Sequence, residues 1–155
     1  MPTAPQDRLN HSPPIAGKSW TIEQLPGLSD REISQLKAAN INTTGQLLQQ
    51  TRTVQQQRSL AERLNVNQRS VRKWCVLADL ARIPAVGCDY CGLLLHIGIS
   101  SMTQLSETPP QLLHQKLLRL QVQILKRRDL CPSASSVQQW VMQARLLDSR
   151  ESNNR

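Results

Sequence analysis

The sequence predicts an all-α protein, and three observations carry this prediction. Leu, Gln, Arg and Ala, which favour helices, are frequent, whereas the 155 residues include only three Trp, one Tyr and no Phe. Apolar residues recur three and four positions apart, the spacing of one helix face. The chain also repeats itself, because a pattern that begins at Leu25 returns 58 residues later at Ile83. No segment shows a convincing strand pattern.

The repeat divides the chain into two duplicated units, residues 19–82 and residues 83–148. The entrance Leu-Pro-Gly-Leu-Ser at 25–29 corresponds to Ile-Pro-Ala-Val-Gly at 83–87. Apolar positions continue to match at the same offset: Leu28/Val86, Ile33/Cys91, Leu36/Leu94, Ile41/Ile99 and Leu47/Leu105. Later positions match at an offset of 66, where Trp74 corresponds to Trp140. Residues 1–18, which contain four prolines, and residues 149–155 are predicted to be disordered tails.

Helical periodicity and end signals predict the elements in order. In the first unit we expect helices over residues 30–39, 44–50, 54–64 and 68–82. In the second unit, after the segment that matches 30–39, we expect helices over 101–106, 110–120 and 136–147. Asn40 and Gly98 stand where a left-handed residue ends a helix. Asn67 is the expected N-cap of the fourth helix, and Ser135 or Ser136 that of the last.

The two entrances resemble the helix-hairpin-helix motif, in which an apolar–Pro–Gly–apolar–Gly hairpin joins two short helices. This resemblance implies DNA binding, because small residues bring the backbone close to a phosphate and the following amides donate to it. Two such hairpins would hold both strands across a minor groove. Each copy departs from the pattern, since Ser29 replaces the second glycine of one and Ala85 the first glycine of the other. The alternative is a helical connection used for packing or protein contact.

A second resemblance covers residues 60–74, which look like a DNA-binding helix-turn-helix. A small residue, Ala61, is followed four positions later by the turn residue Asn65, and then by apolar positions that include Trp74. The second helix would present Gln68, Arg69, Arg72 and Lys73 to a major groove. The matching segment of the second unit, 135–140, lacks the basic residues. Because such helix pairs also occur in proteins that never touch DNA, a basic structural corner is the alternative.

The span from about Leu25 to Leu147 resembles an uncharacterised bacterial family, domain of unknown function 4332. The family has paired helix-hairpin-helix units, with a Trp followed by an Ala-Asp-Leu-x-Arg-Ile segment between them. Trp74, the segment 78–83 and the closing Trp140 with Ala144 match this pattern. The resemblance covers nearly the whole predicted fold and implies that fold, but it implies no mechanism.

Charge indicates the class of partner. The chain carries 19 Lys and Arg against 11 Asp and Glu, a formal charge of +8, and most of the surplus lies between the predicted tails. Such an excess favours nucleic acid, an anionic membrane surface or an acidic protein as the partner. It is also compatible with a protein kept soluble by self-repulsion. No apolar run reaches the ~18 residues needed to span a membrane, and no signal peptide is evident, so a cytoplasmic location is expected.

Metal binding and catalysis find little support in the sequence. Cys88-x-x-Cys91 and His96 are candidate zinc ligands, but Cys75 and Cys131 have no close second ligand. Cys91 also matches the apolar Ile33, so we expect packed thiols, with no metal and no cofactor. The acidic residues are scattered, the three His have no catalytic partner at a recognisable spacing, and no phosphate-binding glycine loop is present. We therefore expect a protein that is not an enzyme.

The expected function is binding of nucleic acid, most readily duplex DNA, mainly through its phosphates and with little sequence specificity. The expected contacts are Gly27, Leu28, Ser29, Arg31, Arg69, Arg72, Lys73, Val86 and Gly87, together with Cys88 in the second hairpin. The competing hypothesis is a protein–protein scaffold or assembly factor with an acidic or apolar partner. Phosphate binding predicts that the basic side chains and both hairpin tips share one face. A scaffold predicts an exposed apolar patch there.

Overall fold

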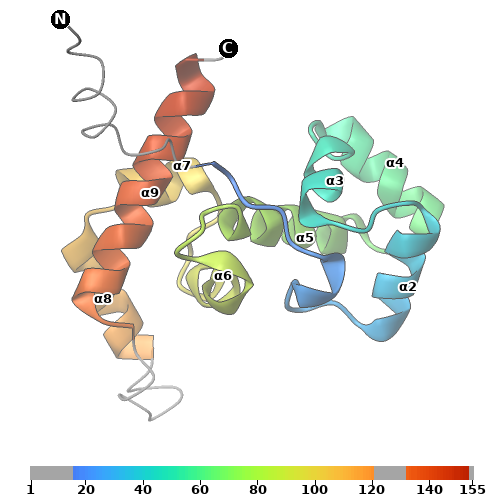
Figure 1. Cartoon of the computed structure of the whole chain (residues 1–155). Coiled ribbons are helices and arrows are strands. Elements are labelled where there is room, and N and C mark those ends of the chain that lie inside the picture. Colours follow the sequence, from blue (N-terminus) through green and yellow to red (C-terminus); the bar gives the residue numbers. More distant parts are fainter. Residues whose placement is uncertain (1–15, 121–131, 154–155) are drawn as a thin grey trace, which may run out of the picture.

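The computed structural model describes residues 16–120 and 132–153, and within them it is all-α, as predicted (Figure 1). A 3-10 helix, η1, opens the described chain. The elements are η1 (Ile22–Gln24), α2 (Asp30–Ala38), α3 (Thr44–Gln49), α4 (Val54–Leu64), α5 (Gln68–Ala81), α6 (Gly87–His96), α7 (Met102–Glu107), α8 (Pro110–Leu120) and α9 (Ala134–Asn153). Two of them, α4 and α8, have the predicted bounds.

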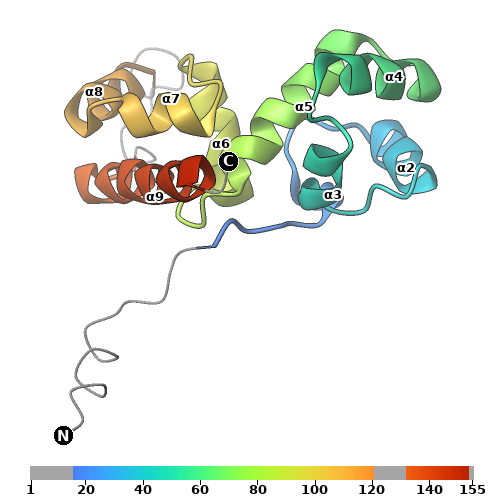
Figure 2. The ribbon, with the colours of Figure 1, turned by 90° about the horizontal axis from the view of Figure 1, so that it is seen from above.

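The helices form two groups that share α5. Figure 2 shows η1, α2, α3 and α4 gathered around the first part of α5, and α6 to α9 gathered beyond its other end. Helix α5 packs against α3 and α4 in the first group and against α6 in the second. Within the second group α9 packs against α7 and α8. Helix α5 is therefore the element that connects the two groups.

The two groups contain the same order of helices with matching buried positions. Trp74 of α5 and Trp140 of α9 are each 1% exposed, and Leu36 and Leu94 are fully buried. The matching extends to a detail of polar capping. The side-chain oxygen of Gln46 accepts from the amide of Asn42 at 2.7 Å, and that of Gln104 accepts from the amide of Ser100 at 2.8 Å. These residues stand 58 positions apart, as the sequence repeat requires.

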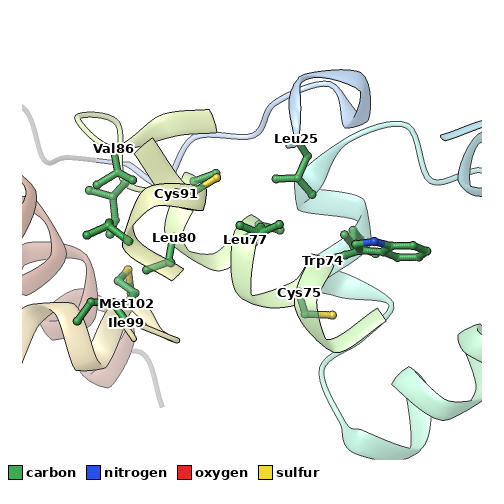
Figure 3. Close-up of a cluster of buried hydrophobic side chains, with 14 of the residues drawn as sticks. Leu25, Trp74, Cys75, Leu77, Leu80, Val86, Cys91, Ile99 and Met102 are labelled. Carbon is green, nitrogen blue, oxygen red and sulfur yellow. The ribbon is translucent and has the colours of Figure 1, made fainter. Parts of the chain in front are cut away.

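One cluster of buried side chains runs through both groups along α5. In Figure 3, Trp74 and Leu77 point toward the first group, where Leu25 lies, whereas Leu80 lies beside side chains of the second group. Val86, Cys91, Ile99 and Met102 surround that end of the cluster. Because the shared helix contributes to both ends of this core, the two groups bury their apolar surface together.

Several helix ends confirm the signals in the sequence. Asn40 has a φ of 64° and Gly98 a φ of 98°, which are left-handed values. The side chain of Asn67 accepts from the amide of Arg69 at 2.9 Å and caps α5. The last helix differs from the prediction, because it is Ser133 whose hydroxyl accepts from the amide of Ser136 at 3.1 Å.

The structure changes two of the expected boundaries. Lys18, expected in the N-terminal tail, donates its amide to the Arg82 carbonyl at 2.8 Å, and the Trp20 indole donates to the Ala81 carbonyl at 2.7 Å. Residues 149–153 are not a coil but the end of α9, and Glu151 forms an ion pair with Arg82. Residues 1–15 and 154–155 of the predicted tails lie outside the described part, as does the segment 121–131.

Candidate nucleic-acid interface

The first hairpin, residues 25–29, presents its tip to solvent. Leu25 anchors it in the core at 3% exposure, whereas Gly27 and Ser29 are exposed and Leu28 is half-buried. Gly27 has a φ of 82°, a backbone conformation that favours glycine. Ser29 caps α2 in a reciprocal arrangement, because its hydroxyl accepts from the Glu32 amide at 3.1 Å while the Glu32 carboxylate accepts from the Ser29 amide at 2.9 Å.

The second hairpin, residues 83–87, exposes Pro84 but buries the residues where α6 begins. Val86 is 1% exposed and Gly87 is buried, with Cys88 half-buried beside them. A Cβ added to Gly87 would lie 3.0 Å from a carbon of the Trp20 ring. The Ala85 amide already has a hydrogen-bond partner, since it donates to the Gln143 side chain at 2.8 Å. Val86 and Gly87, two of the expected contacts, therefore do not lie on an exposed face in this structure.

The two hairpins also have different backbone paths. At the offset of 58, Gly27 corresponds to Ala85 and Ser29 corresponds to Gly87. In the first hairpin Gly27 has the positive φ, and Ser29 has an extended φ of −75°. In the second the positive φ of 55° lies at Gly87, and the residue before the helix, Val86, makes no side-chain cap. Each hairpin thus has its single left-handed glycine at a different position of the motif.

The start of α2 is a weak site for an anion. Helix N-termini attract anions through their free amides and the helix dipole. The first turn of α2, however, already contains the carboxylates of Asp30 and Glu32, and that of Glu32 occupies the Ser29 amide. Arg31 is exposed in the same turn. Cationic side chains must therefore supply most of the attraction for phosphate at this hairpin.

Exposed cationic side chains lie on α5. Helices α4 and α5 are joined by a short turn in which Asn65 is left-handed, with a φ of 54°, as the sequence pattern indicates. Arg69, Arg72 and Lys73 are exposed on α5, and their spacing places them on one helix face. In the described residues the ion pairs join Lys37 to Glu23 and Arg82 to Asp79 and Glu151. The three α5 cations therefore keep their charge free for another partner.

Much of the net charge gathers in this helix pair. Residues 54–73 contain five Lys and Arg and one Glu, a charge of +4 out of the total of +8. Helix α5 and the first hairpin also meet, because the Lys73 ammonium lies 3.6 Å from the position of a Cβ on Gly27. One exposed tip and the basic face of α5 therefore adjoin. The sequence predicted both features separately, and the structure brings them together.

The cysteine-containing end of α6 shows no sign of reactive chemistry. Burial raises the pKa of the Cys88 thiol to about 11, with Asp89 adding to it, and burial raises the pKa of Cys91 to about 12. Burial also raises the pKa of Cys75. These thiols are protonated at neutral pH and so are poor nucleophiles. Within residues 16–120 and 132–153 no group of three His, Cys, Asp or Glu side chains could hold a metal ion; Cys131 lies outside that part.

Exposed apolar side chains are spread over several helices. Val54 of α4, Tyr90 of α6 and Leu112 of α8 each lie on a different element, and Tyr90 packs on Trp140 with ring centroids 5.0 Å apart. Met142 and Leu146 are both 51% exposed and stand one turn apart on α9. No helix in the described ranges is long and apolar enough to cross a bilayer.

Comparisons with known proteins identify the family and leave the function open. A family model described as Domain of unknown function (DUF4332) matches residues 26–147. Neither the search of curated proteins nor the search of solved structures returned a match. The family match begins in the first hairpin and ends within α9, and so includes α2 to α8 and most of α9. The chain belongs to the DUF4332 family.

Proposed function

We propose that this protein binds nucleic acid, with duplex DNA as its partner, through the basic face of α5 and the adjoining first hairpin. The binding is non-enzymatic and is directed mainly at backbone phosphates. Its expected contacts are Arg69, Arg72, Lys73 and, at the edge, Arg31, all of which are exposed. Val86 and Gly87, which are buried, are not among them. A nucleic-acid partner is compatible with the cytoplasmic location that the sequence indicates.

The observation that carries this proposal is the group of three exposed cations on one face of α5 with no ion pair among the described residues. A charge of +4 within residues 54–73 creates a local positive potential that attracts a polyanion. Arg and Lys side chains that contact phosphates position a duplex without reading its sequence. The expected result is affinity that depends steeply on salt and little on sequence.

Of the two hairpins that resemble the helix-hairpin-helix motif, only the first, residues 25–29, takes part in the proposed binding. A symmetric clamp on both strands would need two accessible tips, and the second tip lies under Trp20. Base reading by the helix-turn-helix is a further possibility of the same surface, since Gln68 and Arg69 begin the exposed face of α5. A phosphate-directed interaction requires only the cations, and we therefore propose that mode.

The test is binding to a labelled duplex of about 25 base pairs, followed by fluorescence anisotropy at several salt concentrations. The Arg69→Gln/Arg72→Gln variant should bind more weakly, and the slope of log K against log salt should fall by about 2. The matched control is Lys116→Gln/Arg119→Gln, which removes two exposed charges from α8 and should leave the slope unchanged. Absence of wild-type binding at low salt, or equal loss in both variants, contradicts the proposal.

One observation favours a second candidate, a protein–protein contact through α9. Met142 and Leu146 form an exposed apolar pair one turn apart, and the positions of α9 that match the α5 cations are Ser135, Gln138 and Gln139. Paired apolar anchors on a helix suit a partner protein more than a polyanion. If duplex binding fails, Met142→Ser/Leu146→Ser is the variant to compare with wild type in a search for a protein partner.

A further inference from the structure

A cleft of about 250 Å³ lies where the first hairpin meets α5 and α6. Pro26 and Gly27 of the hairpin form one wall, Lys73 of α5 a second, and Gly92 and His96 of α6 a third. The walls come from both halves of the molecule, since α6 begins the second helix group. The cleft is separate from the Trp20-covered tip of the second hairpin.

The chemistry of the lining suits an anion. Lys73 and His96 supply the ionisable side chains, and none of the lining residues is acidic. Lys73 supplies a positive charge on one wall, and the imidazole of His96 supplies a hydrogen-bond donor on another. Near the end of α6 that holds His96, the Ile97 amide donates to the carbonyls of Leu93 and Leu94, the Gly98 amide to that of Leu95 and the Ile99 amide to that of Leu94.

Two glycines lie where the walls approach each other, and a Cβ at either position would make only an ordinary contact. A Cβ on Gly92 would lie 3.6 Å from Pro26, and a Cβ on Gly27 would lie 3.6 Å from the Lys73 ammonium. Gly27 is exposed and left-handed, so its backbone faces the cleft without a side chain between it and Lys73. Leu77 and Leu95 complete the lining, so the polar groups available to a compact anion such as phosphate are Lys73, His96 and the exposed backbone of Gly27.

We propose that this cleft is a phosphate site in which Lys73 and His96 bind one phosphate group of the nucleic-acid backbone. The inference rests on the proposed function for the identity of the ligand. It extends that function by assigning a binding site to one phosphate. Because Lys73 belongs to the first helix group and His96 to the second, the bound phosphate contacts both halves. The rest of the duplex then follows the Arg69 and Arg72 face of α5.

The test titrates the full chain with inorganic phosphate at about pH 6 and follows backbone amides by NMR. The expected result is saturable shifts at Gly27, Gly92 and His96, with affinity reduced about tenfold or more in Lys73→Gln and in His96→Gln. Matched controls are Lys116→Gln and His114→Gln on α8, which remove the same side-chain types and should leave the shifts unchanged. Circular dichroism verifies that each variant is folded.

The outcomes separate the cleft from the proposed function. Shifts that do not saturate, or that persist unchanged in Lys73→Gln and His96→Gln, overturn the cleft site even if a duplex still binds through Arg69 and Arg72. Saturable phosphate binding in a protein that binds no duplex at low salt overturns the assignment to nucleic acid. Saturable binding of phosphate together with weaker duplex binding in His96→Gln supports both.

Discussion

The two halves of this chain share their buried positions and differ in their surfaces. Trp74 of α5 and Trp140 of α9 occupy matching core positions, each 1% exposed. Around them the surface differs, because Arg69, Arg72 and Lys73 correspond to Ser135, Gln138 and Gln139. The hairpins diverge in the same sense, with one tip exposed and the other under Trp20. One helical framework thus has a basic surface on α5 in its first half and an uncharged one at the matching positions of α9 in its second.

The comparison is most strongly tested by removing the two matching tryptophans. Trp74→Ala and Trp140→Ala should each lower the free energy of unfolding by about 3–5 kcal/mol, because each leaves a large cavity. Since the core is one cluster that α5 shares, each variant should unfold in a single transition in urea, as should wild type. A separate early transition in Trp140→Ala alone would show that the halves are independent.

The buried second hairpin predicts the next largest effect. Gly87→Ala should cost about 2–4 kcal/mol, because alanine is strained at a φ of 55° and its Cβ would lie 3.0 Å from the Trp20 ring. Gly98→Ala, at a φ of 98° with nothing within 4 Å, should cost only the strain, about 1–2 kcal/mol. Equal losses, measured by chemical denaturation, would mean that Trp20 does not pack there.

Helix caps predict a smaller effect that sharpens the comparison between matching positions. Thr43 and Ser101 cap α3 and α7, and each accepts from the amide three residues on. Thr43→Ala and Ser101→Ala should therefore each cost about 1 kcal/mol, and Ser29→Ala should cost about the same for α2. If the losses of stability in the Thr43 and Ser101 variants differ by more than the loss in the Ser29 variant, the caps of α3 and α7 are not equivalent.

A further expected effect concerns pH and the thiols of α6, which are absent from α2. Burial raises the pKa of Cys88 to about 11 and that of Cys91 to about 12, from an ordinary value of 9.0. The folded chain therefore keeps protons that the unfolded chain loses above pH 9, so this contribution to stability is complete below that pH and declines as pH rises toward 11.

Urea midpoints should accordingly fall less between about pH 8 and about pH 10 in Cys88→Ala/Cys91→Ala than in wild type. The comparison is made within each variant, so a general loss of stability from the substitutions does not affect it. An equal fall in both proteins would show that these thiols do not contribute.

Local features of the structure were predictable from the sequence because local signals determine them. Helix α4 has its predicted bounds because Thr53 and Gln56 cap one end and left-handed Asn65 terminates the other. The basic face of α5 follows from residue spacing alone, since positions 69, 72 and 73 lie on one side of any helix. The match between the two halves likewise needs only the repeat of apolar positions.

Features that depend on distant contacts were not predictable in this way. The second hairpin is buried because Trp20, 67 residues earlier in the chain, covers Gly87. Helix α9 continues to Asn153 where polar residues suggested a tail, and its Glu151 pairs with Arg82. The pKa of Arg82 shows the strength of this contact, because burial lowers it but Glu151 and Asp79 outweigh burial and raise it. The cleft at Lys73 and His96 also depends on how α5 and α6 pack.

The most direct test of the account is to map where a short duplex contacts the protein, by following backbone amide shifts during titration at low salt. The account predicts that shifts gather on α5 from Gln68 to Lys73, on the turn at Asn65 and at Gly27, and that α8 and α9 are unaffected. Shifts centred on Met142 and Leu146 of α9, or none at all, would contradict it.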